Sequence, residues 1–239
     1  MSNGHWLLKA FNTIGLVLTL GVSMNTEAGL FGFGGTSWKE EVLLHDGSKI
    51  VVERSVERGG RHEIGQQPPI KEQSLVFNFP AVNERITWKS GYSEDVGLAD
   101  FMPLLLDILQ GSAYMVTAPV GCLSYNKWGR PNPPYVIFKY QGKEWQRIPL
   151  QELPTEIKTP NLIFSSPDIE VEKTGKSFIT AEMIKQLIND YKQPEYKTIL
   201  REALPNGGGI TSCEVLVHYK CGWGAPGEFN RKYFERTCK

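Results

Sequence analysis

Alternating apolar and polar positions predict that the folded part of the chain begins with a β-hairpin. Residues 41–45 and 48–57 are rich in Val, Ile and Leu, and they flank the dipeptide Asp46-Gly47. Asp-Gly between two such runs is typical of a two-residue type I′ turn, because both central residues of that turn need positive φ. We therefore expect an antiparallel pair of strands with its turn at Asp46 and Gly47.

Two more hairpins are indicated further along the chain. The first has an alternating strand, a turn over residues 80–84 and an apolar return strand (Leu75, Phe77, Phe79; Ile86, Trp88). The second gives the strongest hairpin signal, with a turn at Gln141-Gly142 between two alternating strands (Val136, Phe138, Tyr140; Trp145, Arg147, Pro149). Each hairpin has one apolar face, so each needs another layer to cover it.

Four other segments give shorter or less specific signals. Residues 101–109 form an apolar run that fits a buried strand or a buried helix, and the pattern leaves both open. Residues 114–116, 162–164 and 213–220 are predicted as strands.

The spacing of apolar positions changes to a helical period near residue 180. A helix over residues 180–191 is predicted from its Thr180 cap and from apolar residues at i, i+3, i+4 and i+7 (Ile184, Leu187, Ile188, Tyr191). A second helix over residues 194–204 is expected, since Pro194 suits a first helical turn and apolar residues recur on one face. The predicted fold is α+β, with antiparallel β-hairpins forming the main sheet and these two amphipathic helices packed on it.

The N-terminal residues have the pattern of a signal peptide. Residues 1–28 contain an early Lys9, an apolar stretch over residues 11–24, and the small-residue sequence Thr26-Glu27-Ala28 before Gly29. The apolar stretch is shorter than the roughly 20 residues that span a bilayer, so cleavage between Ala28 and Gly29 is favoured over an uncleaved anchor or a buried helix. We expect a signal peptide over 1–28, a flexible leader over 29–37, a single domain over 38–239, and a periplasmic or secreted location.

The balance of charge argues against two classes of partner. The chain has 26 basic and 26 acidic residues, and the signal peptide removes one of each, so the net charge stays at zero. Arg54, Arg58 and Arg61 are the nearest approach to a basic cluster, but glutamates alternate with them. Nucleic acid, and a stable membrane anchor after cleavage, are therefore not expected, since both interactions usually use clustered basic or long apolar segments.

The four cysteines favour disulfides over a metal site. Cys122, Cys213, Cys221 and Cys238 all follow the signal peptide, and an even number in an oxidising compartment predicts two disulfides. Three pairings are possible, and we favour Cys221 with Cys238 and Cys122 with Cys213. Cys213, His218 and Cys221 resemble part of a zinc site, but on a regular strand His218 points away from the face that the two cysteines share.

Sequence motifs for cofactors and catalysis lack their required context. Residues 222–227 fit G-x-G-x-x-G, but the chain ends before the helix and second strand of a dinucleotide site. Gly175-Lys176-Ser177 lacks the first glycine of a phosphate-binding loop, where Glu170 stands instead. We therefore name no catalytic residue, metal or cofactor, although distant side chains can still meet in the fold.

The most distinctive segment is the loop over residues 125–135. It combines three prolines with Tyr125, Trp128, Arg130 and Tyr135, residue types that are enriched at binding hot spots. It is a candidate surface for a protein or carbohydrate partner. The alternative is that its aromatic side chains pack the loop onto the sheet, which is the commoner role of such residues.

Four segments together resemble a family of exported proteins of Gram-negative bacteria that has no assigned activity (residues 38–47, 59–64, 125–135, 193–197). The resemblance implies a periplasmic or secreted location and assigns no site residue. We expect an exported binding or interaction protein without enzymatic activity. The alternative is a hydrolase of cell-envelope or sugar substrates, whose carboxylates meet only in the fold and of which one has a raised pKa.

Overall fold

The computed structural model describes residues 35–60, 62–79, 83–205, 210 and 212–238. The predicted signal peptide with its cleavage site at Ala28 and Gly29, and residues 29–34 of the predicted leader, lie outside the described residues. Gly35–Leu43 forms the first strand, β1, so the prediction of a flexible leader is wrong for residues 35–37. These residues are paired with the next strand, with Gly35 opposite Glu57 and Ser37 opposite Ser55.

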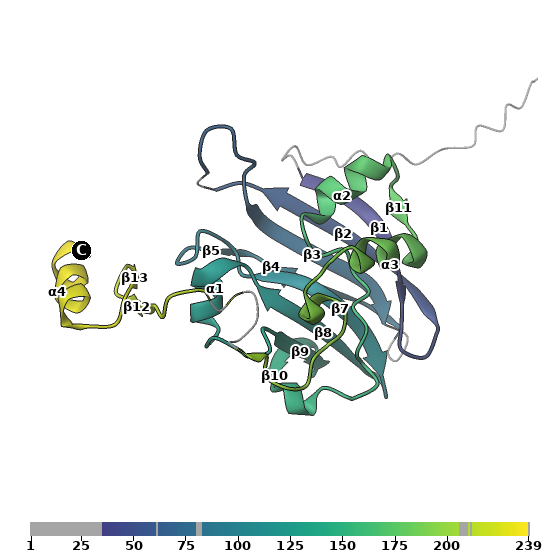
Figure 1. Cartoon of the computed structure of the whole chain (residues 1–239). Coiled ribbons are helices and arrows are strands. Elements are labelled where there is room, and N and C mark those ends of the chain that lie inside the picture. Colours follow the sequence, from purple (N-terminus) through teal and green to yellow (C-terminus); the bar gives the residue numbers. More distant parts are fainter. Residues whose placement is uncertain (1–34, 61, 80–82, 206–209, 211, 239) are drawn as a thin grey trace, which may run out of the picture. The chain divides into compact units, whose positions relative to one another are not determined.

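The larger sheet has five strands in the order β11-β1-β2-β3-β4 (Figure 1). β1, β2 (Lys49–Arg58), β3 (Ile70–Phe79) and β4 (Glu84–Ser90) are antiparallel, as the first two predicted hairpins require. The short β11 (Phe178–Ile179) adds to the free edge of β1 in parallel. The α+β class is therefore confirmed, but the main sheet is mixed and not built from antiparallel hairpins alone.

The turn between β1 and β2 differs from the predicted type I′ turn. The N–H of Leu44 donates to the carbonyl of Ser48 at 2.8 Å, and the N–H of Gly47 donates to the carbonyl of Leu44 at 3.0 Å. Within this turn only Gly47 has a positive φ, of 86°. The loop therefore has three residues, His45 to Gly47, with the glycine in the left-handed region, which is the next most common hairpin geometry.

The second sheet is fully antiparallel, in the order β10-β9-β8-β7. Its strands are β7 (Phe101–Leu109), β8 (Ser112–Pro119), β9 (Val136–Gln141) and β10 (Glu144–Ile148). Residues 101–109 are thus a strand, and the run is apolar because both faces of β7 are buried over much of its length. Gln141 pairs with Glu144, and Gly142 and Lys143 both have positive φ, so the turn lies one residue later than predicted.

Four α-helices and four very short strands complete the described elements. The helices are α1 (Gly121–Lys127), α2 (Pro167–Thr174), α3 (Ala181–Asn189) and α4 (Glu228–Thr237). The strands form two small pairs, β5 (Tyr92–Ser93) with β6 (Leu98–Ala99), and β12 (Val217–Tyr219) with β13 (Gly222–Gly224). The predicted strand over 213–220 is therefore reduced to its last part.

Helix α3 confirms the first helix prediction, and the hydroxyl of Thr180 accepts a bond from the N–H of Met183. The second predicted helix, over 194–204, is wrong, because only a 3₁₀ turn at Pro194–Tyr196 forms. Beyond it, the N–H of Ile199 donates to the carbonyl of Lys158, and the Arg201 side chain donates to several carbonyls of residues 150–157. These tertiary hydrogen bonds replace the helical ones.

The smaller sheet lies between two other layers and has an apolar cluster on each side. One cluster joins it to the larger sheet and includes Leu75, Phe77, Trp88, Leu106 and Met115. The other joins it to the coil-rich segment over residues 150–200 and to α3, and it also includes three side chains of the larger sheet (Leu105, Ile137, Ile157, Ile184, Ile199; Trp38, Val56, Ile179). This burial explains why so many positions of the second sheet are apolar.

A buried ion pair lies within the layers. Arg54 on β2 donates through Nη1 to Oε1 of Glu40 on β1 at 2.8 Å, and both side chains have 0% exposure. Trp38 Nε1 also donates to Glu40, and Arg54 donates to the carbonyl of Ile163. Burial raises the pKa of Glu40, and the positive charge of Arg54 opposes that rise.

Asn161 closes the edge of β7 and joins it to β1. Its Oδ1 accepts from the N–H of Leu106 at 3.0 Å, and its Nδ2 donates to the carbonyls of Leu106 at 2.8 Å and Leu43 at 2.9 Å. The amide side chain thus replaces a neighbouring strand at this point. The next residue, Leu162, donates its N–H to Leu104, and residues 162–164 form no strand, contrary to the prediction.

We expect Asn161→Ala to destabilise the protein by roughly 3 kcal/mol, because it leaves two buried backbone groups of Leu106 on β7 and the partly buried carbonyl of Leu43 on β1 without this partner. Urea unfolding measures the change. Thr159→Ala, an exposed change in the same loop, is the control and should stay within about 0.5 kcal/mol of the parent. Equal stability of the two variants would contradict the bridging role of Asn161.

Candidate functional site

The described residues form an open groove of about 470 Å³. The β1–β2 turn, the loop over residues 156–161 and helix α3 form its walls. Its base is apolar and includes Leu44, Ile184 and Ile188, which are all buried. Such a combination of an apolar base with a few polar groups is the usual composition of a small-molecule site.

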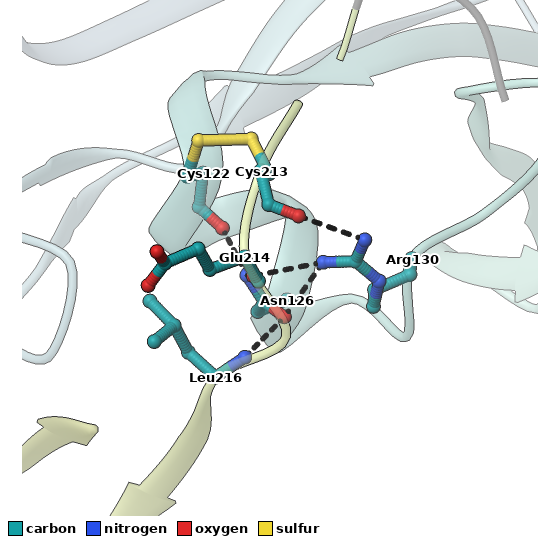
Figure 2. The surroundings of a disulfide bond; sticks show 6 residues. All are labelled: Cys122, Asn126, Arg130, Cys213, Glu214 and Leu216. Carbon is teal, nitrogen blue, oxygen red and sulfur yellow. Dashed lines mark hydrogen bonds between the residues drawn. A yellow bond between two sulfur atoms is a disulfide. The ribbon is translucent and has the colours of Figure 1, made fainter. Parts of the chain in front are cut away.

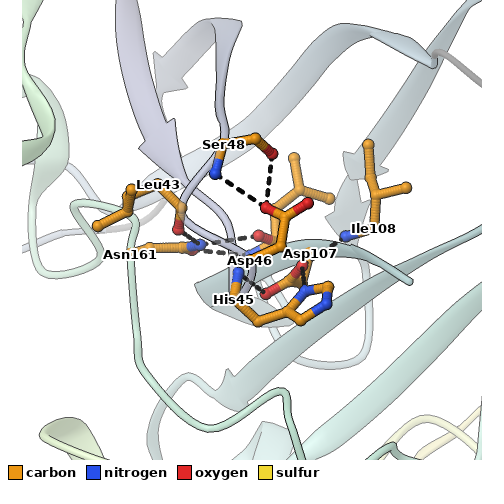
Figure 3. Close-up of polar contacts among 8 residues, drawn as sticks. Leu43, His45, Asp46, Ser48, Asp107, Ile108 and Asn161 are labelled. Carbon is orange, nitrogen blue, oxygen red and sulfur yellow. Dashed lines mark hydrogen bonds and ion pairs between the residues drawn. The ribbon is translucent and has the colours of Figure 1, made fainter.

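His45 and Asp107 meet in this groove from two different sheets (Figure 3). His45 lies in the β1–β2 turn and Asp107 lies on β7. Nδ1 of His45 is 2.7 Å from Oδ1 of Asp107, and the backbone N–H of His45 donates to Oδ2 at 3.0 Å. The side chains are 16% and 4% exposed, so the pair is largely shielded from solvent. Asp107 therefore fixes both the backbone and the ring of His45.

The two groups shift each other's protonation. The hydrogen bond that the His45 ring makes to the Asp107 carboxylate raises the pKa of His45, with a smaller contribution from the charges of Asp107, Asp46 and Glu156. Burial raises the pKa of Asp107, although its hydrogen bonds to His45 and to the N–H of Ile108 oppose the rise. With Nδ1 held by the carboxylate, Nε2 is the ring nitrogen of His45 that has no hydrogen bond to the described residues.

The rim of the groove is charged. Lys158, Lys185 and Lys197 are exposed there, and none of them forms an ion pair within the described part of the chain. Two exposed carboxylates, Glu156 and Glu182, also line the groove, and Glu182 is 3.3 Å from Lys49. Together with Asp107, the lining has three carboxylates against three lysines; Asp107 and Glu182 are in ion pairs, whereas none of these lysines is in one within the described ranges.

Nucleophilic chemistry has little support at this site. Across residues 35–60, 62–79, 83–205, 210 and 212–238, no hydroxyl or thiol is hydrogen-bonded to His45. The hydroxyl of Ser48, two residues after Asp46, donates to Asp46 and not to His45 (Figure 3). In the same described ranges, no group of His, Cys, Asp and Glu is arranged to hold a metal ion.

A serine and a lysine also meet elsewhere in the fold. Nζ of Lys127 lies 2.6 Å from Oγ of Ser93, which is the contact that a serine–lysine catalytic pair would make. However, Asp95 and Asp100 lie 2.9 and 3.0 Å from the same ammonium group. Their hydrogen bonds raise the pKa of Lys127 despite its burial, so the lysine stays protonated and does not act as a base at neutral pH.

The residues of the 125–135 loop named from sequence pack into the fold. Tyr125 and Tyr135 are buried, and Trp128 is half-buried with its ring 4.6 Å from that of Phe101. The hydroxyl of Tyr135 donates to the carbonyl of Glu195 at 2.8 Å. The structure agrees with the packing alternative for these three aromatic side chains, and they leave little aromatic surface for a partner.

Arg130 of this loop binds a distant segment of the same chain (Figure 2). Its guanidinium group donates to the carbonyls of Cys213 and Glu214, each at 3.0 Å. Asn126 donates to the carbonyl of Glu214 and accepts from the N–H of Leu216. The loop and α1 therefore hold the start of the C-terminal segment.

Two disulfides fasten the same segment. They join Cys122 to Cys213 and Cys221 to Cys238, which is the pairing favoured from the sequence. The first links α1 to the segment beside the Arg130 contacts, and the second links the turn between β12 and β13 to the residue that follows α4. All four thiols are thereby used, so none of them is a nucleophile or a metal ligand in this structure.

The His45–Asp107 pair was not predicted, because 62 residues separate its members and neither belongs to a motif. One signal did exist in the sequence. Asp107 is an acidic residue inside the apolar run 101–109, and a carboxylate in a buried strand needs a partner. The sequence does not indicate that this partner is His45.

The described residues contain no helix that is long and apolar enough to cross a membrane. Comparison with known proteins finds no matching family model, no similar curated protein and no similar solved structure. The chemistry of the site therefore depends on its own geometry.

We expect Asp107→Asn to lower the pKa of His45, because the carboxylate hydrogen bond is the main cause of its elevation. NMR titration of the imidazole protons measures this value. Asp46→Asn is the matched control, since it removes a nearby charge from the same turn without touching the ring, and its effect should be smaller. Equal effects would show that Asp107 acts only as a distant charge.

The same pair should make stability depend on pH. A raised pKa in the folded state means that His45 stabilises the fold fully below its ordinary value of about 6.5, and that this stabilisation is lost as pH rises through the folded value. In Asp107→Asn, the free energy of unfolding should fall less than in the parent as the pH rises above about 6.5.

Trp128→Ala should reduce the free energy of unfolding by about 2 kcal/mol, less than for a fully buried tryptophan, because the side chain is half-buried against Phe101 and Phe138. Thermal and urea unfolding measure the loss. A fully stable variant would leave the packing interpretation without support and favour a role of the ring at the surface.

Proposed function

We propose that the chain is an exported binding protein without enzymatic activity, and that a small ligand occupies the groove beside His45. The observation that carries the proposal is the groove itself, an open cavity of about 470 Å³ with a buried apolar base and a charged rim. The proposed site differs from the 125–135 loop considered first, whose aromatic residues are used for packing.

The rigidity of the groove supports this function. The Asp107 carboxylate fixes His45, Asn161 ties the loop over residues 156–161 to β7, and Ile184 and Ile188 anchor α3 in the core. A site whose walls are already ordered loses little conformational entropy when a ligand binds. The groove is therefore suited to recognition with little rearrangement.

An extracytoplasmic location accords with the two disulfides, because such bonds persist in oxidising compartments. They fasten the segment that follows residue 212, where the short strands and α4 make few contacts with the main core. A periplasmic or secreted location remains part of the proposal, together with cleavage after Ala28.

A hydrolase is the second candidate, and the His45–Asp107 pair is the observation that favours it. An imidazole oriented by a carboxylate can take a proton from a water molecule that attacks an ester or a glycosidic centre. The carboxylates of the groove are held by cationic groups: Asp107 binds His45, and Glu182 lies beside Lys49, which Glu41 also contacts.

The groove can be tested with a variant that fills it. The probe is 8-anilinonaphthalene-1-sulfonate, whose fluorescence rises in apolar sites, followed also by NMR chemical shifts. We expect shifts at residues of the groove in the parent and a loss of at least tenfold in affinity in Thr159→Trp, because a bulky side chain then occupies the rim. Thr155→Trp, an exposed change in the same segment but outside the lining, is the matched control.

Binding that is equal in both variants, or shifts that lie elsewhere, would overturn the groove as the site. Hydrolysis of p-nitrophenyl acetate is measured on the same samples. A turnover that disappears in His45→Gln would favour the hydrolase over the binding protein.

A further inference from the structure

The charges of the groove restrict the class of ligand. Asp107 pairs with His45, and Glu182 shares Lys49 with Glu41, which lies closer to the ammonium group at 2.8 Å, so Glu156 is the lining carboxylate without an ion pair in the described ranges. Lys158, Lys185 and Lys197 also have no ion-pair partners there. Three unpaired lysines against one unpaired carboxylate favour an anionic group at the lysines and disfavour a cationic one there.

The three lysines come from separate parts of the chain, and the fold holds their backbones together. The carbonyl of Lys158 accepts from the N–H of Ile199 at 2.8 Å and from the hydroxyl of Thr198 at 3.1 Å, so residues 158 and 197 lie on adjoining segments. Lys185 lies next to Ile184 on α3. The Ile184 side chain is 1% exposed, so it holds that face of the helix against the core. The cations therefore surround one groove and are not scattered over the surface.

An inorganic anion alone would leave the apolar base of the groove uncovered. Leu44, Ile184 and Ile188 lie beneath the rim, and a hydrated phosphate or sulfate would not cover them. A neutral hydrocarbon would cover them but would leave the lysines unmatched. A molecule with both an apolar part and a negative group satisfies the base and the rim together.

We infer that the groove binds a small anionic amphiphile, a carboxylate with an aliphatic or aromatic body, whose negative group lies at Lys158, Lys185 and Lys197 and whose body covers Leu44, Ile184 and Ile188. This inference rests on the proposed binding function and specifies its ligand class. His45 is a further polar group of the same groove, since its Nε2 has no hydrogen bond to the described residues.

Three probes with one tail separate the contributions of charge and apolar surface. Octanoate, 1-octanol and octylammonium are titrated into the full exported chain at low salt and followed by NMR shifts of groove residues. Octanoate should bind about tenfold more tightly than 1-octanol, since three exposed ion pairs contribute roughly 0.2–1 kcal/mol each, and octylammonium should bind most weakly. Added salt should weaken octanoate and leave 1-octanol unchanged.

A matched pair of triple variants then assigns the charge effect to the rim. Lys158→Gln, Lys185→Gln and Lys197→Gln together should weaken octanoate about tenfold and leave 1-octanol unaffected. Lys89→Gln, Lys176→Gln and Lys192→Gln make the same change in net charge at exposed positions outside the lining, and should not weaken octanoate.

The failure of this inference can be told from the failure of the proposed function. If 1-octanol binds the groove as tightly as octanoate, or if both triple variants weaken octanoate equally, the anionic class is wrong while groove binding stands. If no probe shifts the groove residues, the binding function itself is overturned. If octanoate binding is weakened only in the first triple variant, the result supports both the anionic ligand class and the binding function.

Discussion

The Glu40–Arg54 ion pair is the constraint on which the arrangement of layers depends. Its two members lie on neighbouring strands, and Arg54 also donates to the carbonyl of Ile163, which belongs to the segment along the edge of β7. Burying two full charges is costly, so the pair is tolerated only where each partner is held in place. Trp38, through its hydrogen bond to Glu40 and its ring near the Arg54 guanidinium group at 5.1 Å, completes the enclosure. Sliding the segment that contains Ile163 along the larger sheet would break these contacts, because it would leave the Arg54 guanidinium group buried without one of its hydrogen-bond partners.

The groove follows from the same layering. The β1–β2 turn carries His45, β7 of the smaller sheet supplies Asp107, and the segment over residues 150–200 with α3 supplies Asn161 and the lysines of the rim. Two sheets and this segment therefore meet at one edge, and each contributes a wall. A polar pair at such a junction serves the fold and the site together, since the contacts that hold the turn against β7 also orient the imidazole. This shared role explains why two residues so far apart in sequence are held together in the groove.

Local patterns predicted the fold well, and long-range hydrogen bonds account for most of the differences. The three hairpins and α3 are visible in the sequence because alternation, turn residues and an N-cap act over a few positions. The helix expected at 194–204 failed because the Arg201 guanidinium group and the N–H of Ile199 bind carbonyls of a loop about 40 residues earlier. The His45–Asp107 pair could not be predicted from such local sequence patterns. Its acidic member stood out in an apolar run, but only the packing of the two sheets brings the imidazole to it.

The Cys122–Cys213 disulfide has a topological consequence. It closes a covalent ring across 91 positions, which includes β9, β10, α2, α3 and most of the groove wall. A protease that cuts an exposed turn within the ring, such as the one at Gly142 and Lys143, opens a peptide bond but separates no fragment. Both new ends remain attached through sulfur, and the surrounding layers hold them in register. In a compartment rich in proteases, a chain cut once within this ring would stay in one covalent piece.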